Sequence, residues 1–281
     1  MVSVQRRLQQ RNAPTGFRGL LPARLLRWRQ PVWWHELALI AVGYWAYTKT
    51  RNTIPGSVTT ALLHGWDVQR LQDWLHLNFE LSFNQFIART EWLAQVMDYY
   101  YATVHFIMTG GVLIWLFLRR PQVYRGARTV LITTSVLALF CFWLYPTAPP
   151  RLLPGLGYVD TLLQFHTWGS LADPNVAEHS NQFAAMPSLH TAWALWCGLA
   201  IFHCARRAWV RWAGLAYPLC TITVIIGTAN HFLLDAFAGA SLLALGFLIQ
   251  RLMSGHGAFA PPADAPTAAA PRQLARETVD A

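Results

Sequence analysis

Six apolar stretches recur along the chain, separated by shorter stretches that are rich in proline, glycine and charged residues. About 20 apolar residues wound into a helix cross the roughly 30 Å hydrocarbon core of a bilayer, and each of the stretches comes close to that length. The pattern therefore predicts an all-α fold, a bundle of six transmembrane helices over residues 33–49, 99–118, 129–145, 189–205, 208–227 and 233–252.

Residues 52–97, which join the first two predicted spans, show a different pattern. Apolar residues from Val68 to Leu75 recur at helical spacing, with Gln72 and other polar residues on the opposite side, and a second apolar stripe begins at Phe83. Neither stripe is long or apolar enough to cross a membrane. The pattern predicts amphipathic helices that lie on the membrane surface; a partner-binding face is the alternative.

The composition also indicates a membrane protein. Of the 281 residues, 54% are hydrophobic, only 12% are charged and 14 are tryptophan, which is too apolar for a water-soluble domain of this length. The formal net charge of +9 does not indicate nucleic-acid binding, because the arginines cluster between the apolar stretches, as cytoplasmic anchors do.

These basic clusters predict the orientation in the membrane. They lie before residue 30, between the second and third predicted spans, and between the fourth and fifth. The positive-inside rule places all of them, and both termini, in the cytoplasm. Residues 1–30 are then expected to be a basic disordered arm, residues 31–253 the membrane domain, and the Ala- and Pro-rich residues 254–281 a disordered tail.

Three clusters of polar side chains fall on the opposite, extracytoplasmic side. The first is the sequence YPTAPPRLLP after the third predicted span. Its prolines stop the helix and hold Arg151 in a stiff extended segment. A guanidinium held there is suited to bind a phosphate through two hydrogen bonds. The alternative is an ordinary interfacial arginine.

The second cluster is the sequence PSLH at the start of the fourth predicted span. A proline near the first turn favours a helix start, and the free amides there, together with the Ser188 hydroxyl, can bind an anion. His190 would face that anion. A histidine at a helix start is also a common interfacial or capping residue, so this cluster alone does not decide between the two roles.

The third cluster is the sequence NHFLLD at the start of the sixth predicted span. On a helix, His231 and Asp235 lie one turn apart on the same face. The carboxylate can then accept the imidazole N–H and raise the basicity of the ring. Such a pair is costly in an apolar helix, which indicates a functional site. A metal site with His190, His231 and Asp235 as ligands is an alternative.

Taken together, APPR, PSLH and NHxxxD at one membrane face resemble the type-2 phosphatidic acid phosphatase superfamily. The chain looks most like its inositol phosphorylceramide synthase branch of inositolphosphotransferases, over about residues 99–250. The resemblance implies that His231 attacks phosphorus to form phosphohistidine, that Asp235 orients it and that His190 protonates the leaving oxygen. It also implies that Ser188 and Arg151 bind the phosphate and that no metal or other cofactor is needed.

Two cations of the larger phosphatase branch of that superfamily are missing from this sequence. Leu144 stands where that branch has a lysine, and Val224 and Ile225 take the place of a Ser-Arg pair. The synthase-like branch also lacks the pair. Lys49 and Arg51, at the outer end of the first predicted span, are candidate replacements for the missing charge, or else interfacial anchors.

The expected function is that of a membrane enzyme that cleaves or transfers the phosphate or phospho-head group of a membrane lipid at the extracytoplasmic surface. Water as acceptor would make it a phosphatase, and a lipid or polyol hydroxyl would make it a phosphotransferase. The motifs do not distinguish these acceptors, although a cover formed by residues 52–97 would exclude water and favour transfer. A non-catalytic lipid-phosphate binder or transporter is the alternative.

Overall fold

The computed structural model describes residues 31–53, 58–167, 182–263 and 265, and within these ranges the backbone is helical, with loops, one isolated bridge between Thr147 and Ala184, and no strand. The long helices are α3 (Trp33–Thr53), α6 (Glu91–Arg119), α7 (Pro121–Leu144), α10 (Leu189–Cys204), α11 (Ala208–Gly227) and α12 (Leu233–Ser254). The shorter ones are α4 (Val58–Trp74), α5 (Phe79–Ala88), η2 (Pro150–Leu152) and α8 (Thr161–Gln164).

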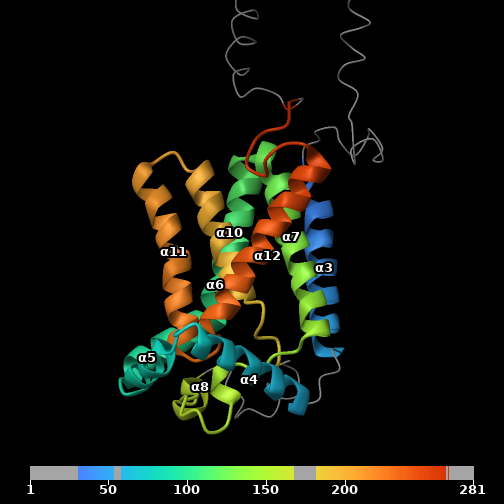
Figure 1. Cartoon of the computed structure of the whole chain (residues 1–281). Helices are drawn as coiled ribbons and strands as arrows, with labels where there is room; N and C mark the ends of the chain where they lie inside the picture. Colours follow the sequence, from blue (N-terminus) through green and yellow to red (C-terminus); the bar gives the residue numbers. More distant parts are fainter. Residues whose placement is uncertain (1–30, 54–57, 168–181, 264, 266–281) are drawn as a thin grey trace, which may run out of the picture.

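The long helices run side by side as a bundle, and α4, α5 and α8 gather at one end of it (Figure 1). Within the described residues, α6, α7, α11 and α12 are long and apolar enough to cross a membrane. The chain is therefore a multi-pass membrane protein. α10 is apolar but has only 16 residues. α3 has polar residues at both ends and is not among the helices that are apolar enough. Crossings by α3 and α10 remain predictions.

Two helices begin earlier than predicted. α6 starts at Glu91 instead of residue 99, and α7 starts at Pro121 instead of residue 129. Charged residues such as Arg128 had suggested a loop before α7, but proline fits the first position of a helix. Arg128 instead forms an ion pair with Glu36 of α3. The helices therefore extend past the apolar stretches from which they were predicted.

The core lies where α10 packs among α6, α7, α11 and α12. Trp196 of α10 is fully buried, and its indole N–H donates to the carbonyl oxygen of Ala127 at 2.9 Å. Because α10 is surrounded by protein, much of its apolar surface packs against other helices. This position brings the start of α10 next to the start of α12.

The helices α4 and α5, here called the α4–α5 cover, turn several of their polar residues inward, while other polar residues of α4 stay exposed. Gln72, Glu80 and Asn84 are each at most 1% exposed, whereas Leu71 and Trp74 are 46% and 75% exposed. The prediction that Gln72 lies on the exposed side, opposite an apolar stripe that includes Leu71, was wrong. The buried polar groups bond to protein backbone, as described below, so polarity did not mark the water-facing side.

The ends of the chain lie mostly outside the described residues. Residues 1–30, the predicted basic arm, are outside them, as are residues 266–281 of the predicted tail. After α12 the chain turns at Gly255, which has a positive φ of 76°. Ala258 is then buried against the core, and Phe259 stacks on His203. The first residues after the predicted boundary at residue 253 thus pack against the helices, and the division into arm, membrane domain and tail stays a prediction.

Candidate active site

His231 lies in the tight turn between α11 and α12. The turn passes through Ala229, whose φ is 52°, and the backbone amides of Asn230 and His231 both donate to the carbonyl oxygen of Ile225. His231 itself is only 4% exposed. Its ring is therefore held by the turn on one side and by the surrounding helices on the other.

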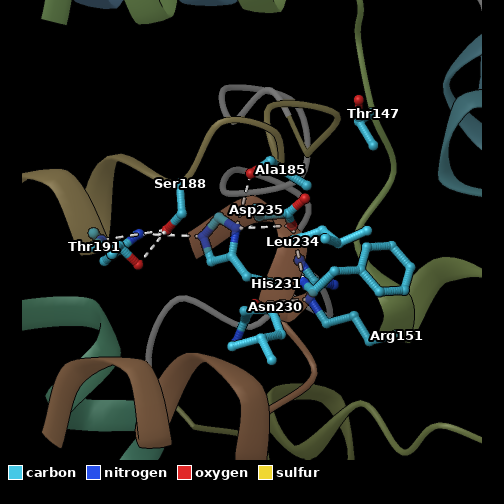
Figure 2. A network of polar contacts seen from close by, with 12 residues as sticks. Thr147, Arg151, Ala185, Ser188, Thr191, Asn230, His231, Leu234 and Asp235 are labelled. Atoms are coloured by element: carbon cyan, nitrogen blue, oxygen red, sulfur yellow. Dashed lines mark hydrogen bonds and ion pairs between the residues drawn. The ribbon is translucent and has the colours of Figure 1, made fainter. Parts of the chain in front are cut away.

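The contacts of His231 determine which ring nitrogen carries the proton. Nδ1 lies 2.9 Å from the carbonyl oxygen of Ala185 and 3.4 Å from Oδ2 of Asp235 (Figure 2). A carbonyl oxygen can only accept a hydrogen bond, so Nδ1 must be the protonated nitrogen. In the neutral ring Nε2 then keeps its lone pair, as a nucleophile requires.

Asp235 reaches back to His231 from the first turn of α12. His231 precedes that helix and is not part of it, which differs from the predicted arrangement, but the two side chains still meet. Oδ2 of Asp235 also accepts the backbone N–H of Phe232 at 2.9 Å. Asp235 is fully buried, and its Oδ1 has no hydrogen-bond partner among the described residues. The carboxylate thus joins the helix start to the imidazole.

His190, in the first turn of α10, faces Nε2 of His231, the unprotonated ring nitrogen. Its Nδ1 lies 3.4 Å from Nε2 of His231. The ring of Tyr101 stacks on the His190 ring, with centroids 4.2 Å apart, and the His105 ring meets its edge at the same distance. Two rings from α6 therefore confine His190 beside His231.

Ser188 is the N-cap of α10 and is fully buried. Its hydroxyl accepts hydrogen bonds from the amide and the hydroxyl of Thr191, both at 3.3 Å, and its own amide donates to the carbonyl oxygen of Asp235 at 2.9 Å. Pro187 precedes this cap and is not in the first turn. The structure therefore shows Ser188 joining the two helix starts, and phosphate binding by its hydroxyl remains a prediction.

Arg151 lies in η2, beside the turn that carries His231. Its amide donates to the carbonyl oxygen of Ala229 at 3.1 Å, and its Nε donates to Oδ1 of Asn230 at 2.9 Å. Its Nη1 pairs with Asp160 at 2.9 Å, and the side chain is 8% exposed. Arg151 thus contacts the turn that carries His231, but a carboxylate that was not predicted already shares its charge.

The remaining candidate cation, Lys49, lies exposed near the end of α3, which packs against α7. Its role as a replacement for the missing phosphate-binding charge remains a prediction. The side chain of Arg51 is outside the described set. No three His, Cys, Asp or Glu side chains among the described residues are grouped as metal ligands.

A family model described as the PAP2 superfamily matches residues 66–249, which is more than half of the 281 residues. The chain belongs to the PAP2 superfamily. The match includes Arg151, Ser188, His190, His231 and Asp235. No curated protein and no solved structure matches the chain significantly.

Membership of the PAP2 superfamily, together with the four apolar helices, indicates a membrane phosphatase or phosphotransferase. It does not distinguish the synthase-like branch from the phosphatases. Membership of the superfamily does not identify the substrate or the acceptor of this protein.

Several residues of the site were not predicted from the sequence. The Ala185 carbonyl reaches His231 only because its segment pairs with Thr147, whose carbonyl oxygen accepts the Ala185 amide at 3.1 Å. Asn230 belongs to the NHFLLD motif, but its contact with Arg151 was not predicted. An aspartate before a short helix is a recognisable N-cap, and the Asp160 side chain does cap α8 by accepting from the Leu163 amide. The sequence gives no sign that Asp160 also pairs with Arg151.

Proposed function

We propose that this protein transfers a phosphoryl or phospho-head group from a lipid-linked phosphate through a covalent intermediate on His231. The observation that supports this most directly is the arrangement of three groups around one imidazole. Ala185 and Asp235 hold the proton on Nδ1, and the unprotonated Nε2 lies 3.4 Å from Nδ1 of His190. One ring is thereby prepared as a nucleophile while its neighbour is positioned to handle a proton.

In the first step, Nε2 of His231 attacks phosphorus in line with the bond to the leaving oxygen. An N–P bond forms, the P–O bond breaks, and protonated His190 gives its proton to the departing alkoxide. General acid help of this kind contributes about 10²- to 10⁴-fold. Arg151 stabilises the phosphate oxygens, while Asp235 stabilises the positive charge that develops on His231.

In the second step, an acceptor hydroxyl attacks the phosphorus of the phosphohistidine. Neutral His190 now takes the proton from that hydroxyl, the N–P bond breaks, and His231 is restored. We propose a lipid or polyol hydroxyl as acceptor, as in inositol phosphorylceramide synthases. Two observations support this acceptor: the motifs resemble that branch, and the α4–α5 cover buries the turn that carries His231, which limits the entry of water.

We further propose six membrane spans, with α3 and α10 as the two additional ones. The arginine clusters then lie in the cytoplasm with both termini, and the site opens at the extracytoplasmic surface. In that arrangement the substrate is a lipid of the outer leaflet, and Lys49 at the outer end of α3 can add positive charge near its headgroup.

The test uses the full chain purified in detergent. Phosphatidic acid and phosphatidylinositol, each carrying radioactive phosphorus, are offered as donors in the presence of a chelator. At least one donor is expected to place acid-labile label on the wild-type protein. H231A should take no label, H190A should be labelled about 10²-fold more slowly, and H203A, a histidine at the other end of α10, should behave as wild type.

Added acceptors then separate the activities. Label that leaves the protein only when a ceramide or diacylglycerol is supplied supports transfer, and release in buffer alone supports hydrolysis. Full labelling of H231A would exclude the proposed nucleophile. Loss of turnover in chelator would support the metal alternative, and donor binding without label would support a non-catalytic binder.

A further inference from the structure

The first turn of α12 receives its hydrogen-bond acceptors from the α4–α5 cover. A helix begins with backbone N–H groups that have no partner inside the helix. In α12, the Leu233 amide donates to Oε1 of Glu80 at 2.6 Å, and the Leu234 amide donates to Oε1 of Gln72 at 3.2 Å. The Gln72 side-chain amide also donates to Glu80 at 3.1 Å. Two buried side chains from outside α12 thus cap it.

The same cover also holds the end of α11. The Asn84 side-chain amide donates to the carbonyl oxygen of Gly227 at 2.9 Å, which is the last residue of α11. A Cβ at Gly227 would lie 3.1 Å from Phe83 and 3.2 Å from Ile87, so α5 packs directly against this backbone. The turn that carries His231 is therefore held on both sides by residues of α5.

Asp235 is the residue within α12 that could otherwise cap its first turn. It occupies the third position of the helix, where a carboxylate commonly reaches back to the free amides. In the structure, Oδ2 of Asp235 accepts a hydrogen bond from the Phe232 amide and lies 3.4 Å from Nδ1 of His231. With the amides of Leu233 and Leu234 left without partners in a buried site, Asp235 would be drawn toward them and away from the imidazole.

We propose that Glu80, supported by Gln72, is a positioning residue for the reaction: it binds the first free amides of α12 and so keeps Asp235 in place for His231. This inference rests on the proposed function, because it assumes that His231 is the nucleophile. It assigns the α4–α5 cover a role in catalysis beyond the exclusion of water.

The surroundings of Glu80 shift the pKa of its carboxyl group. Burial raises the pKa of Glu80 to about 7, the hydrogen bonds from Gln72 and Leu233 act in the opposite direction, and the nearby Asp235 raises the pKa further. Burial raises the pKa of the nearby Tyr158 hydroxyl, and the charges of Glu80 and Asp73 raise it further. Burying a carboxyl group costs desolvation free energy, and the hydrogen bonds from the Leu233 amide and from Gln72 to its two oxygens offset this cost.

The test compares E80L, which has no acceptor, with E80Q, which keeps an acceptor for the Leu233 amide but loses the contact with Gln72. The measured quantity is the single-turnover rate at which the donor labels His231. E80L should be about tenfold slower than wild type with the donor KM little changed, and E80Q should be slower by at most about threefold. E91Q, an acid-to-amide change at an exposed site at the start of α6, should keep the wild-type rate.

A double mutant shows whether Glu80 acts through Asp235. In a D235N background, E80L should cause no further decrease in rate, because the contact that it disturbs is already lost. A wild-type rate in E80L, an E80Q protein as slow as E80L, or a full additional decrease in D235N would each overturn the inference.

Folding defects are separated by a second variant. If E80L cannot be purified, Q72L removes only the acceptor of Leu234 and should slow labelling by a smaller factor; a wild-type rate in folded Q72L would overturn the inference. Wild-type protein that takes no label from either donor would overturn the proposed function and this inference with it. Labelled wild type with equally fast E80L would overturn the inference alone.

Discussion

The two ring nitrogens of His231 contact different kinds of groups. A backbone carbonyl and a carboxylate lie on the Nδ1 side, and another imidazole lies on the Nε2 side. A neutral imidazole has one donor and one acceptor nitrogen, so the surroundings of Nδ1 decide what Nε2 can do. The reactivity proposed for His231 therefore comes from its neighbours and not from the residue type.

Arg151 provides a test at the same scale. A guanidinium has five N–H groups, and Asn230 and Asp160 use two of them. Lysine keeps the charge but cannot make both contacts and also bind a phosphate in a planar, two-bond geometry. R151K should lower kcat/KM for the labelled donor about 10²-fold. R89K, an exposed site just after α5, is the control, and an R151K protein within twofold of wild type would contradict phosphate binding by Arg151.

The starts of α10 and α12 form the site because their backbones touch. The Ser188 amide donates to the carbonyl oxygen of Asp235, and a Cβ built on Gly239 would lie only 2.3 Å from the Ser188 carbonyl oxygen. Gly239 follows Asp235 by one turn. Only a residue without a side chain allows the two helices to approach this closely, and this approach is what places His190 beside His231.

Gly239 therefore links stability to activity. In G239A the new methyl group must push α12 away from Ser188, which should destabilise the protein by about 1–3 kcal/mol and slow the labelling of His231. Thermal unfolding in detergent and the labelling rate measure the two effects. G111A in α6 is the matched control, because a Cβ at Gly111 meets nothing within 4 Å; unchanged unfolding and labelling in G239A would show that the helix starts are not this close.

Viewed as a whole, the molecule separates its membrane-spanning and reactive parts. The bundle supplies rigid helix starts, and α4, α5, α8 and the loop with η2 gather at the end where those starts meet (Figure 1). The exposed apolar residues of the cover, such as Trp74 and Phe86, suit helices that contact the membrane surface. In the proposed orientation, the cover would lie between the lipid and the buried site.

The proposed orientation makes the two ends of the bundle accessible from different sides. Ser82 on α5 and Arg206 between α10 and α11 are both exposed. In a chain without its native cysteines, a membrane-impermeant maleimide should label S82C in intact cells and R206C only after permeabilisation. Labelling of both positions under the same condition would contradict the six-span arrangement, since an odd number of crossings would no longer separate them.

The helical elements could be predicted from the sequence because hydrophobic patterning is a local property. The predicted ends of α11 agree with the structure, and the start of α10 was placed at Leu189. The starts of α6 and α7 were placed too late, because the apolar segment marks only the membrane-embedded part of a helix. In α4, Gln72 was assigned to the wrong side, because polarity alone does not reveal whether its partner is water or a buried amide.

For the site, the sequence by itself predicted which residues would carry the proposed chemistry: two histidines, an acid four residues after one of them, and an arginine after a proline pair. Only the tertiary structure decided how they work, through the proton on Nδ1 facing Ala185, the pairing of Arg151 with Asp160, and the capping of α12 by Glu80. The contacts of Ala185 and Glu80 join segments that are far apart in the chain, and Arg151 and Asp160, nine residues apart, meet only because the loop after α7 folds back. Their geometry depends on how the helices pack, and no local pattern of residues records it.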